Sequence, residues 1–154
     1  MRFKINILFV EKEYYSNISQ SRNIIIPDSY NINNHQEEVS FANYIINKFG
    51  GTIELLPESN RELRPDFIWN GKLWDFKTVS TKSSIDSQVR KGIKQILSNV
   101  GGLFLNIDRS NLKESSIISI IADRVSRENK RILKSVDIIL IKNGKVLNII
   151  RYKK

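Results

Sequence analysis

The sequence contains no cysteine, one histidine and three prolines among its 154 residues. Without cysteine the chain has no disulfide framework and no thiolate metal site, so its fold does not depend on the redox state of the compartment. The sequence predicts no signal peptide, and no apolar run approaches the ~18 residues that a membrane-spanning helix needs. The single histidine, His35, precedes a predicted helix as an exposed residue, which argues against an RNase mechanism based on histidine.

The composition suits one domain with a sufficient core, since 40% of the residues are hydrophobic. Charge is divided unevenly, because residues 1–70 carry a net charge of −2 and residues 71–154 carry +11. A basic half beside an acidic site is expected of a protein that attracts a polyanionic substrate. A basic surface that only confers solubility, or that fits an acidic protein, is the alternative.

The segment from residue 65 to residue 77 is the most informative part of the sequence. Its Asn70-Gly71 dipeptide separates two alternating apolar runs and predicts a β-hairpin, because both central residues of a type I′ turn need positive φ. In that register Asp66 faces Asp75, and Lys77 lies beside Asp75 on the same face. Opposed carboxylates repel at a Cβ separation of about 5 Å, so a divalent cation is their simplest neutraliser. A solvated hairpin edge is the alternative.

A third carboxylate is predicted from helical spacing. Residues 36–49 have the apolar periodicity of an amphipathic helix that ends at Gly50-Gly51. At about 100° per residue, Glu38 projects into the apolar arc of this helix, whereas Glu37 lies off it. A carboxylate on the core-facing side needs a partner, because burying an unpaired charge is costly. Glu38 is therefore the predicted third member of the site, with Glu37 as the alternative.

The order of these features resembles that of the PD-(D/E)xK nuclease superfamily. The matching residues are Glu38 on its helix, Pro65-Asp66, and Asp75-Phe76-Lys77. Residues 35–151 are also similar to the C-terminal nuclease domain of CdiA-type contact-dependent growth inhibition toxins, some of which cleave tRNA. Residues 1–34 do not map onto that pattern.

The resemblance implies an α/β fold with an αβββαβ core, in which helices flank a mixed sheet. It implies a single nuclease domain with its core at residues 35–151 and an extension at residues 1–34. Asp66, Asp75 and Glu38 would ligate one or two Mg²⁺ or Mn²⁺ ions, with Zn²⁺ as a further candidate, and Lys77 would stabilise the attacking hydroxide or the pentavalent phosphate. Carboxylate oxygens are ligands that Mg²⁺ prefers.

The same resemblance implies a metal-dependent nuclease that cleaves RNA, with tRNA as substrate. Such a toxin would act in the cytoplasm of a target cell, would need a larger parent chain for delivery, and would have a cognate immunity protein, acidic to match the basic half. Two alternatives stay open. One is a DNA endonuclease of the same fold, because the motif acts on the phosphate and not on the sugar. The other is a nucleic-acid-binding or protein-binding module that has lost the site.

A second helix is predicted from the apolar stripe between Ile85 and Val100, ended by Gly101-Gly102. In nucleases of this type the corresponding helix lies alongside the metal site. The polar residues on its remaining face, Gln88, Lys91 and Gln95, are therefore candidate contacts for phosphate or water. Ordinary exposed helix polarity is the alternative for each of them.

The remaining elements indicate an α/β chain with a mixed sheet. Trp69 and Trp74 are either platforms for bases or packing residues, and packing is the commoner use at hairpin positions. The other predicted elements are a strand at 1–10, a polar loop at 11–23, a strand at 103–107, a helix at 112–130, and strands at 136–141 and 146–152 joined by Asn143-Gly144.

Overall fold

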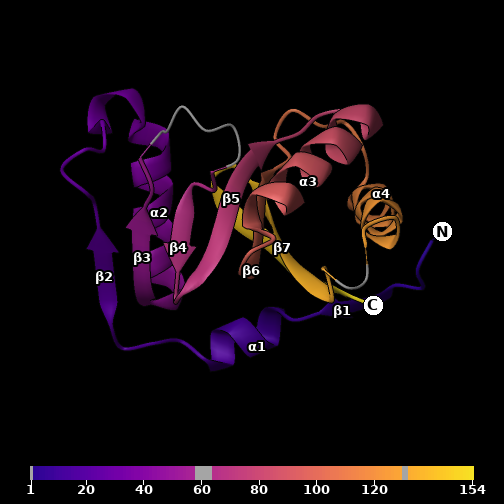
Figure 1. The fold of residues 1–154 in the computed structure, drawn as a ribbon, viewed down its shortest axis with the longest axis horizontal. Helices are drawn as coiled ribbons and strands as arrows, with labels where there is room; N and C mark the ends of the chain where they lie inside the picture. Colours follow the sequence, from indigo (N-terminus) through magenta and orange to yellow (C-terminus); the bar gives the residue numbers. More distant parts are fainter. Residues whose placement is uncertain (1, 58–63, 130–131) are drawn as a thin grey trace.

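A computed structural model describes residues 2–57, 64–129 and 132–154. Its centre is one eight-stranded sheet with the order β1-β8-β7-β6-β5-β4-β3-β2 (Figure 1). The strands are β1 (Asn6–Phe9), β2 (Arg22–Ile25), β3 (Gly51–Leu55), β4 (Phe67–Trp69), β5 (Lys72–Thr78), β6 (Val100–Asn106), β7 (Ser135–Lys142) and β8 (Lys145–Lys153). The helices are α1 (Glu11–Ser16), α2 (Gln36–Phe49), α3 (Lys82–Ile96) and α4 (Glu114–Ser126), with a 3-10 turn η1 (Ile32–Asn34).

The sheet is mixed, as predicted. The pairs β2–β3, β5–β6 and β6–β7 are parallel, whereas the other neighbours are antiparallel. The run from α2 to β6 has the order αβββαβ. The predicted α/β class, with a mixed sheet flanked by helices in one domain, is confirmed. No helix within the described ranges is both long and apolar enough to cross a bilayer.

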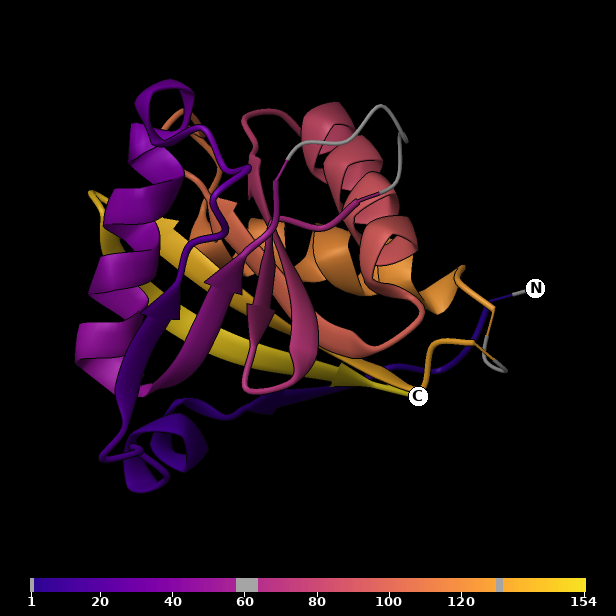
Figure 2. The same cartoon turned by 60° about the vertical axis from the view of Figure 1, so that its left-hand side comes forward.

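Helix α2 covers one face of this sheet and helices α3 and α4 cover the other (Figure 2), and a hydrophobic core lies on each face. One core contains the apolar sides of α3 and α4, and the other contains the apolar side of α2. Alternation along β6 sends Leu103 and Leu105 to the α3 side and Phe104 to the α2 side. Along β5, Trp74 and Phe76 join the α2 side. Asp75 and Lys77 therefore leave the strand toward α3.

Helix α2 covers residues 36–49, in agreement with the predicted range. Its buried positions are Phe41, Ala42, Ile45, Ile46 and Phe49. The helix ends at Gly50, whose φ of 72° favours glycine, and whose N–H donates to the carbonyl of Ile46 at 2.8 Å. The helix that carries Glu37 and Glu38 is thereby fixed at its C-terminal end.

Both Asn-Gly hairpins form where the sequence predicts them. Asn70 and Gly71 have φ values of 51° and 78°, and Asn143 and Gly144 have 53° and 72°. In the first hairpin Phe67 pairs with Trp74 and Trp69 with Lys72, which is the predicted register. The second hairpin joins β7 and β8, the two strands expected near residues 136–141 and 146–152.

Three predicted elements differ from the structure at their ends. The strand expected at 1–10 is shortened to β1, and the strand expected at 103–107 begins earlier, as β6. The helix expected at 112–130 is found as α4, and residue 130 lies outside the described residues. Ends of elements are less strongly encoded than their centres, because terminal residues make fewer contacts.

Two predictions are wrong, one about a loop and one about the end of a helix. The polar stretch 11–23 is not a loop throughout, because it contains α1 and the start of β2. Gly101-Gly102 does not end a helix either, since α3 ends at Ile96 and the glycines lie inside β6. A Cβ on Gly102 would lie 2.6 Å from an atom of the Trp74 ring, so these glycines provide space for a neighbouring side chain.

Candidate active site

The first hairpin brings two aspartates together. Asp66 directly precedes β4, and Asp75 lies within β5. Because Phe67 pairs with Trp74, the same register places Asp66 opposite Asp75. The carboxylate of Asp66 is held in place because its Oδ2 accepts a 2.8 Å hydrogen bond from the N–H of Phe76. The predicted convergence of Asp66 and Asp75 is therefore present in the structure.

Asp75 is a buried carboxylate with little compensation. Its side chain is 1% exposed, and the ammonium of Lys77 lies 3.0 Å from its Oδ2. Neither of its oxygens accepts a protein hydrogen bond of good geometry from the described parts of the chain. Buried carboxylates normally accept several hydrogen bonds, because desolvation of the charge is costly. The oxygens of Asp75 thus retain unused capacity to bind a cation.

The pKa of Asp66 is raised, as expected at a site where too little positive charge offsets two carboxylates. Burial raises the pKa of Asp66 to about 8, and the charge of the neighbouring Asp75 acts in the same direction. The Phe76 N–H and the charge of Lys77 act in the opposite direction and do not offset this effect. The pair therefore holds a proton near neutral pH when nothing else neutralises it, and a divalent cation would take the place of that proton.

Glu38 lies on the opposite side of β5 from this pair, on α2. Its Oε2 accepts a 2.8 Å hydrogen bond from the hydroxyl of Tyr30, and its Oε1 lies 3.9 Å from Nδ1 of His35. Glu38 and Glu37 both line a cavity of about 200 Å³ that Lys77 also borders. Lys77 is thus the residue that connects the aspartate pair with the glutamates.

The structure does not unite all three predicted carboxylates. Within the described ranges, no group of three or more His, Cys, Asp or Glu side chains is placed to hold a metal ion. Asp75 projects toward α3, whereas Glu38 comes from the helix that covers the other face of the sheet. The role of Glu38 as a metal ligand, and the choice between Glu38 and Glu37, stay predictions.

Sequence reasoning missed the surroundings of Glu38. Tyr30, which is 6% exposed, lies in the irregular segment before η1, where no periodicity marks a side chain as a partner. The expected exposure of His35 is wrong, because its side chain is only 17% exposed beside Glu38. Contacts of both residues with Glu38 depend on the fold of this segment, which its local pattern does not indicate.

Helix α3 packs against β5 and β6, alongside the aspartate pair. Gln95 donates a 3.3 Å hydrogen bond from Nε2 to the carbonyl of Arg64, two residues before Asp66, while its Oε1 is buried and has no partner among the described residues. Gln88 is half-buried, and Lys91 is exposed. A contact of Gln88, Lys91 or Gln95 with phosphate stays a prediction.

The two tryptophans are packing residues, as the commoner interpretation predicts. Trp69 and Trp74 are each 4% exposed. Trp74 stacks on Phe104 with ring centroids 4.7 Å apart and an interplanar angle of 22°. Trp69 donates from Nε1 to the carbonyl of Gly50 at 3.2 Å, which ties the hairpin to the end of α2. These contacts fix the strands that carry the aspartates.

Comparisons with known proteins give one likeness. No protein-family model matches the chain, and no curated protein matches it. Among solved structures, a chain of the CdiA-CT/CdiI toxin and immunity complex from Burkholderia pseudomallei is similar, with a TM-score of 0.46 and 14% sequence identity. The similarity covers 82% of this chain and 97% of that one. A likeness of this size carries no conclusion about activity.

Proposed function

We propose that this chain is a metal-dependent nuclease that hydrolyses phosphodiesters of RNA, with tRNA as the substrate, and that it is the active domain of a bacterial toxin. The observation that carries the proposal is the buried Asp75 carboxylate beside Asp66. Among the described residues, the ammonium of Lys77 is the one positive charge paired with it. The choice of RNA and of a toxin rests on the order of motifs along the sequence, which resembles that of CdiA-type nuclease domains.

The donor set suits Mg²⁺ or Mn²⁺, with Zn²⁺ as the further candidate. Mg²⁺ is commonly held by one or two carboxylates, with water and substrate phosphate in its remaining positions, so Asp66 and Asp75 alone suffice. The oxygens of Asp75, which accept no protein hydrogen bond of good geometry from the described residues, agree with this assignment. When bound, such an ion supplies an acidified water and offsets charge at the scissile phosphate.

The protein residues around the pair have separate tasks in this proposal. Asp66 is oriented by the Phe76 N–H, which keeps one of its oxygens fixed. Lys77 lies between Asp75 and the cavity that Glu38 lines, where its ammonium would offset charge on the attacked phosphate. Glu38, oriented by the Tyr30 hydroxyl, would position a water molecule in the cavity that Lys77 also borders.

The charges on α3 fit a polyanionic substrate. Three of its basic residues, Arg90, Lys91 and Lys94, are exposed on the helix that packs beside β5. A basic surface next to a cation-loaded carboxylate pair would attract and hold a nucleic-acid backbone, and binding would weaken steeply with salt. The same basic surface would fit an acidic immunity protein.

The test is incubation of the purified protein with total tRNA and with plasmid DNA, each with Mg²⁺ or with EDTA. We expect discrete tRNA fragments that require Mg²⁺, and no fragments with the Asp75→Asn variant. Asp123→Asn is the matched control, because this carboxylate is on α4 and 42% exposed. Nicking of plasmid DNA with intact tRNA would assign a DNA endonuclease, and intact substrates in every lane would contradict nuclease activity.

A further inference from the structure

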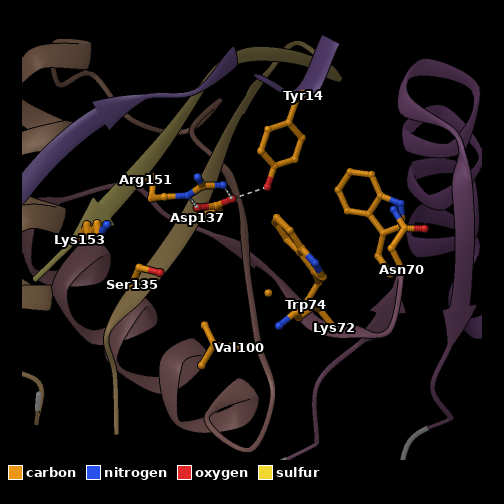
Figure 3. Close-up of a pocket in the computed structure, with 11 residues that line it drawn as sticks. Tyr14, Asn70, Lys72, Trp74, Val100, Ser135, Asp137, Arg151 and Lys153 are labelled. Atoms are coloured by element: carbon orange, nitrogen blue, oxygen red, sulfur yellow. Dashed lines mark hydrogen bonds and ion pairs between the residues drawn. The ribbon is translucent and has the colours of Figure 1, made fainter. Parts of the chain in front are cut away.

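A second polar cavity has a volume of about 420 Å³ (Figure 3). Its lining comes from α1, from the β4–β5 hairpin and from β6, β7 and β8. Trp74 lines this cavity, and the next residue, Asp75, projects in the opposite direction. None of the four residues proposed for catalysis, Glu38, Asp66, Asp75 and Lys77, lines it. It is therefore a separate site.

The second and third residues of β6, Gly101 and Gly102, have no side chains, which leaves room for the Trp74 ring at one wall of the cavity. Gly101 contributes to the lining, and a Cβ on Gly101 would collide with Nε1 of Trp74. A Cβ on Gly102 would collide with the carbonyl oxygen of Asp137. The Trp74 ring therefore lies close to these glycines and forms one wall of the cavity, and Asp137 lies across the cavity from it (Figure 3).

The acid of this cavity is fully engaged by protein groups. Among the described lining residues Asp137 is the single acid, and it is 8% exposed. Its Oδ1 accepts from Nε of Arg151 at 2.7 Å, and its Oδ2 accepts from Nη2 of Arg151 at 3.0 Å and from the Tyr14 hydroxyl at 2.5 Å. Arg151 is also paired with Glu13 at 3.0 Å. The charges of Asp137 and Arg151 are therefore both paired within the protein.

Two lysines remain uncompensated at the cavity. Lys72 and Lys153 line it, both are exposed, and neither forms an ion pair with a residue in the described parts of the chain. The hydroxyl of Ser135 adds a neutral donor. Since the one carboxylate among the described lining residues is already neutralised, the groups left for a ligand are cationic or donating. The site therefore favours an anion.

We propose that this cavity binds a backbone phosphate of the nucleic-acid substrate, through Lys72 and Lys153, away from the carboxylates. The identity of the polymer rests on the proposed nuclease function. Trp69 and Trp74 are each 4% exposed and form a packed wall of the cavity, so the two lysines, and not base stacking, would hold the ligand. The volume also lies within the range of ~300–1,000 Å³ typical of ligand pockets.

The chain offers a direct probe of occupancy, because its only two tryptophans both line the cavity. Tryptophan emission would be followed in EDTA while a single-stranded RNA of about eight nucleotides is added, with AMP and inorganic phosphate as smaller probes. The test variant is Lys72→Ala/Lys153→Ala. The control is Lys142→Ala/Lys145→Ala at the β7–β8 turn, which removes the same charge from exposed positions.

We expect RNA to change the emission, and we expect the Lys72/Lys153 variant to bind about tenfold more weakly than the control variant. Its plot of log affinity against log salt should be shallower by about 0.7, because the one phosphate contact that is lost contributes about 0.7 on a single strand. Equal weakening in both variants, or RNA binding without any change in emission, would overturn the proposal. Binding of AMP or phosphate as tight as that of RNA would also overturn it and indicate a site for small phosphate compounds.

The inference and the proposed nuclease function can fail separately. The Asp75→Asn variant should lose cleavage and keep the tryptophan response, because Asp75 lies outside the cavity. If the wild type cleaves tRNA and the two lysine variants bind RNA alike, the phosphate site is wrong and the nuclease stands. If RNA binding depends on Lys72 and Lys153 and no nucleic acid is cleaved, the phosphate site stands and the nuclease is wrong.

Discussion

The stability of the metal-free protein should fall as pH rises, and Asp66→Asn should remove most of that fall. Burial and the nearby Asp75 raise the pKa of Asp66 in the folded chain to about 8, above its unfolded value near 4. A raised carboxyl pKa means that the folded state holds the proton more tightly. The contribution to stability is therefore complete below pH ~4 and is lost as pH rises toward 8.

The size of this effect can be bounded in two ways. Two carboxylates about 5 Å apart repel by about 3 kcal/mol at an effective dielectric constant of about 20. A pKa shift of about four units corresponds to at most ~6 kcal/mol, at about 1.4 kcal/mol for each unit. Relaxation and water entry lower the second figure. We expect the free energy of unfolding to fall by about 3 kcal/mol between pH 5 and pH 9 on account of Asp66 alone.

Urea denaturation in EDTA at several pH values would measure this fall. The control is Asp123→Asn, which removes one charge from an ion pair on α4 and should keep the wild-type pH dependence. The quantity to compare is the difference between each variant and the wild type, because the general effect of net charge cancels in it. Parallel pH curves for the wild type and Asp66→Asn would refute the reasoning that the carboxylate pair is strained without a cation.

Three further outcomes follow from the same structure. Mg²⁺ or Mn²⁺ at 100 times its dissociation constant should raise the free energy of unfolding at pH 9 by about 2.7 kcal/mol, and an equal gain in Asp75→Asn would contradict the assigned site. Gly102→Ala should cost about 1–3 kcal/mol in urea denaturation and shift tryptophan emission, because its Cβ would press on Trp74, and an unchanged emission would argue against that contact. Gln95→Ala should lower tRNA cleavage while costing about 1 kcal/mol of stability or less, because it releases Arg64 near Asp66, and full activity would exclude that anchoring role.

The parts of the fold that were predictable are those set by residues that lie close together in the sequence. The Asn70-Gly71 turn fixes its own register, because few residues other than glycine and asparagine adopt positive φ, and that register alone places Asp66 opposite Asp75. Helix α2 was equally clear, since its apolar spacing and its terminal glycine agree. In both cases the residues that decide the structure lie within a few positions of one another.

The parts that could not be predicted depend on distant partners. The Tyr14 hydroxyl reaches Asp137 across 123 residues of sequence, and β1 pairs with β8 at the other end of the chain. Gly101-Gly102 was misread because a glycine pair after an apolar stripe has the same local pattern whether it ends a helix or makes room for a ring such as Trp74. The placement of Glu38 has the same cause, since the face that α2 covers is set by the whole sheet.

The most direct test of the central claim is cleavage of tRNA by four purified proteins, with Mg²⁺ and with EDTA, after circular dichroism has shown that all four are folded. The account predicts Mg²⁺-dependent fragments from the wild type and from Asp123→Asn, and none from Asp75→Asn or Lys77→Ala. Fragments of undiminished amount from folded Asp75→Asn, or from the wild type in EDTA, would contradict the claim that the Asp66 and Asp75 pair holds the catalytic cation.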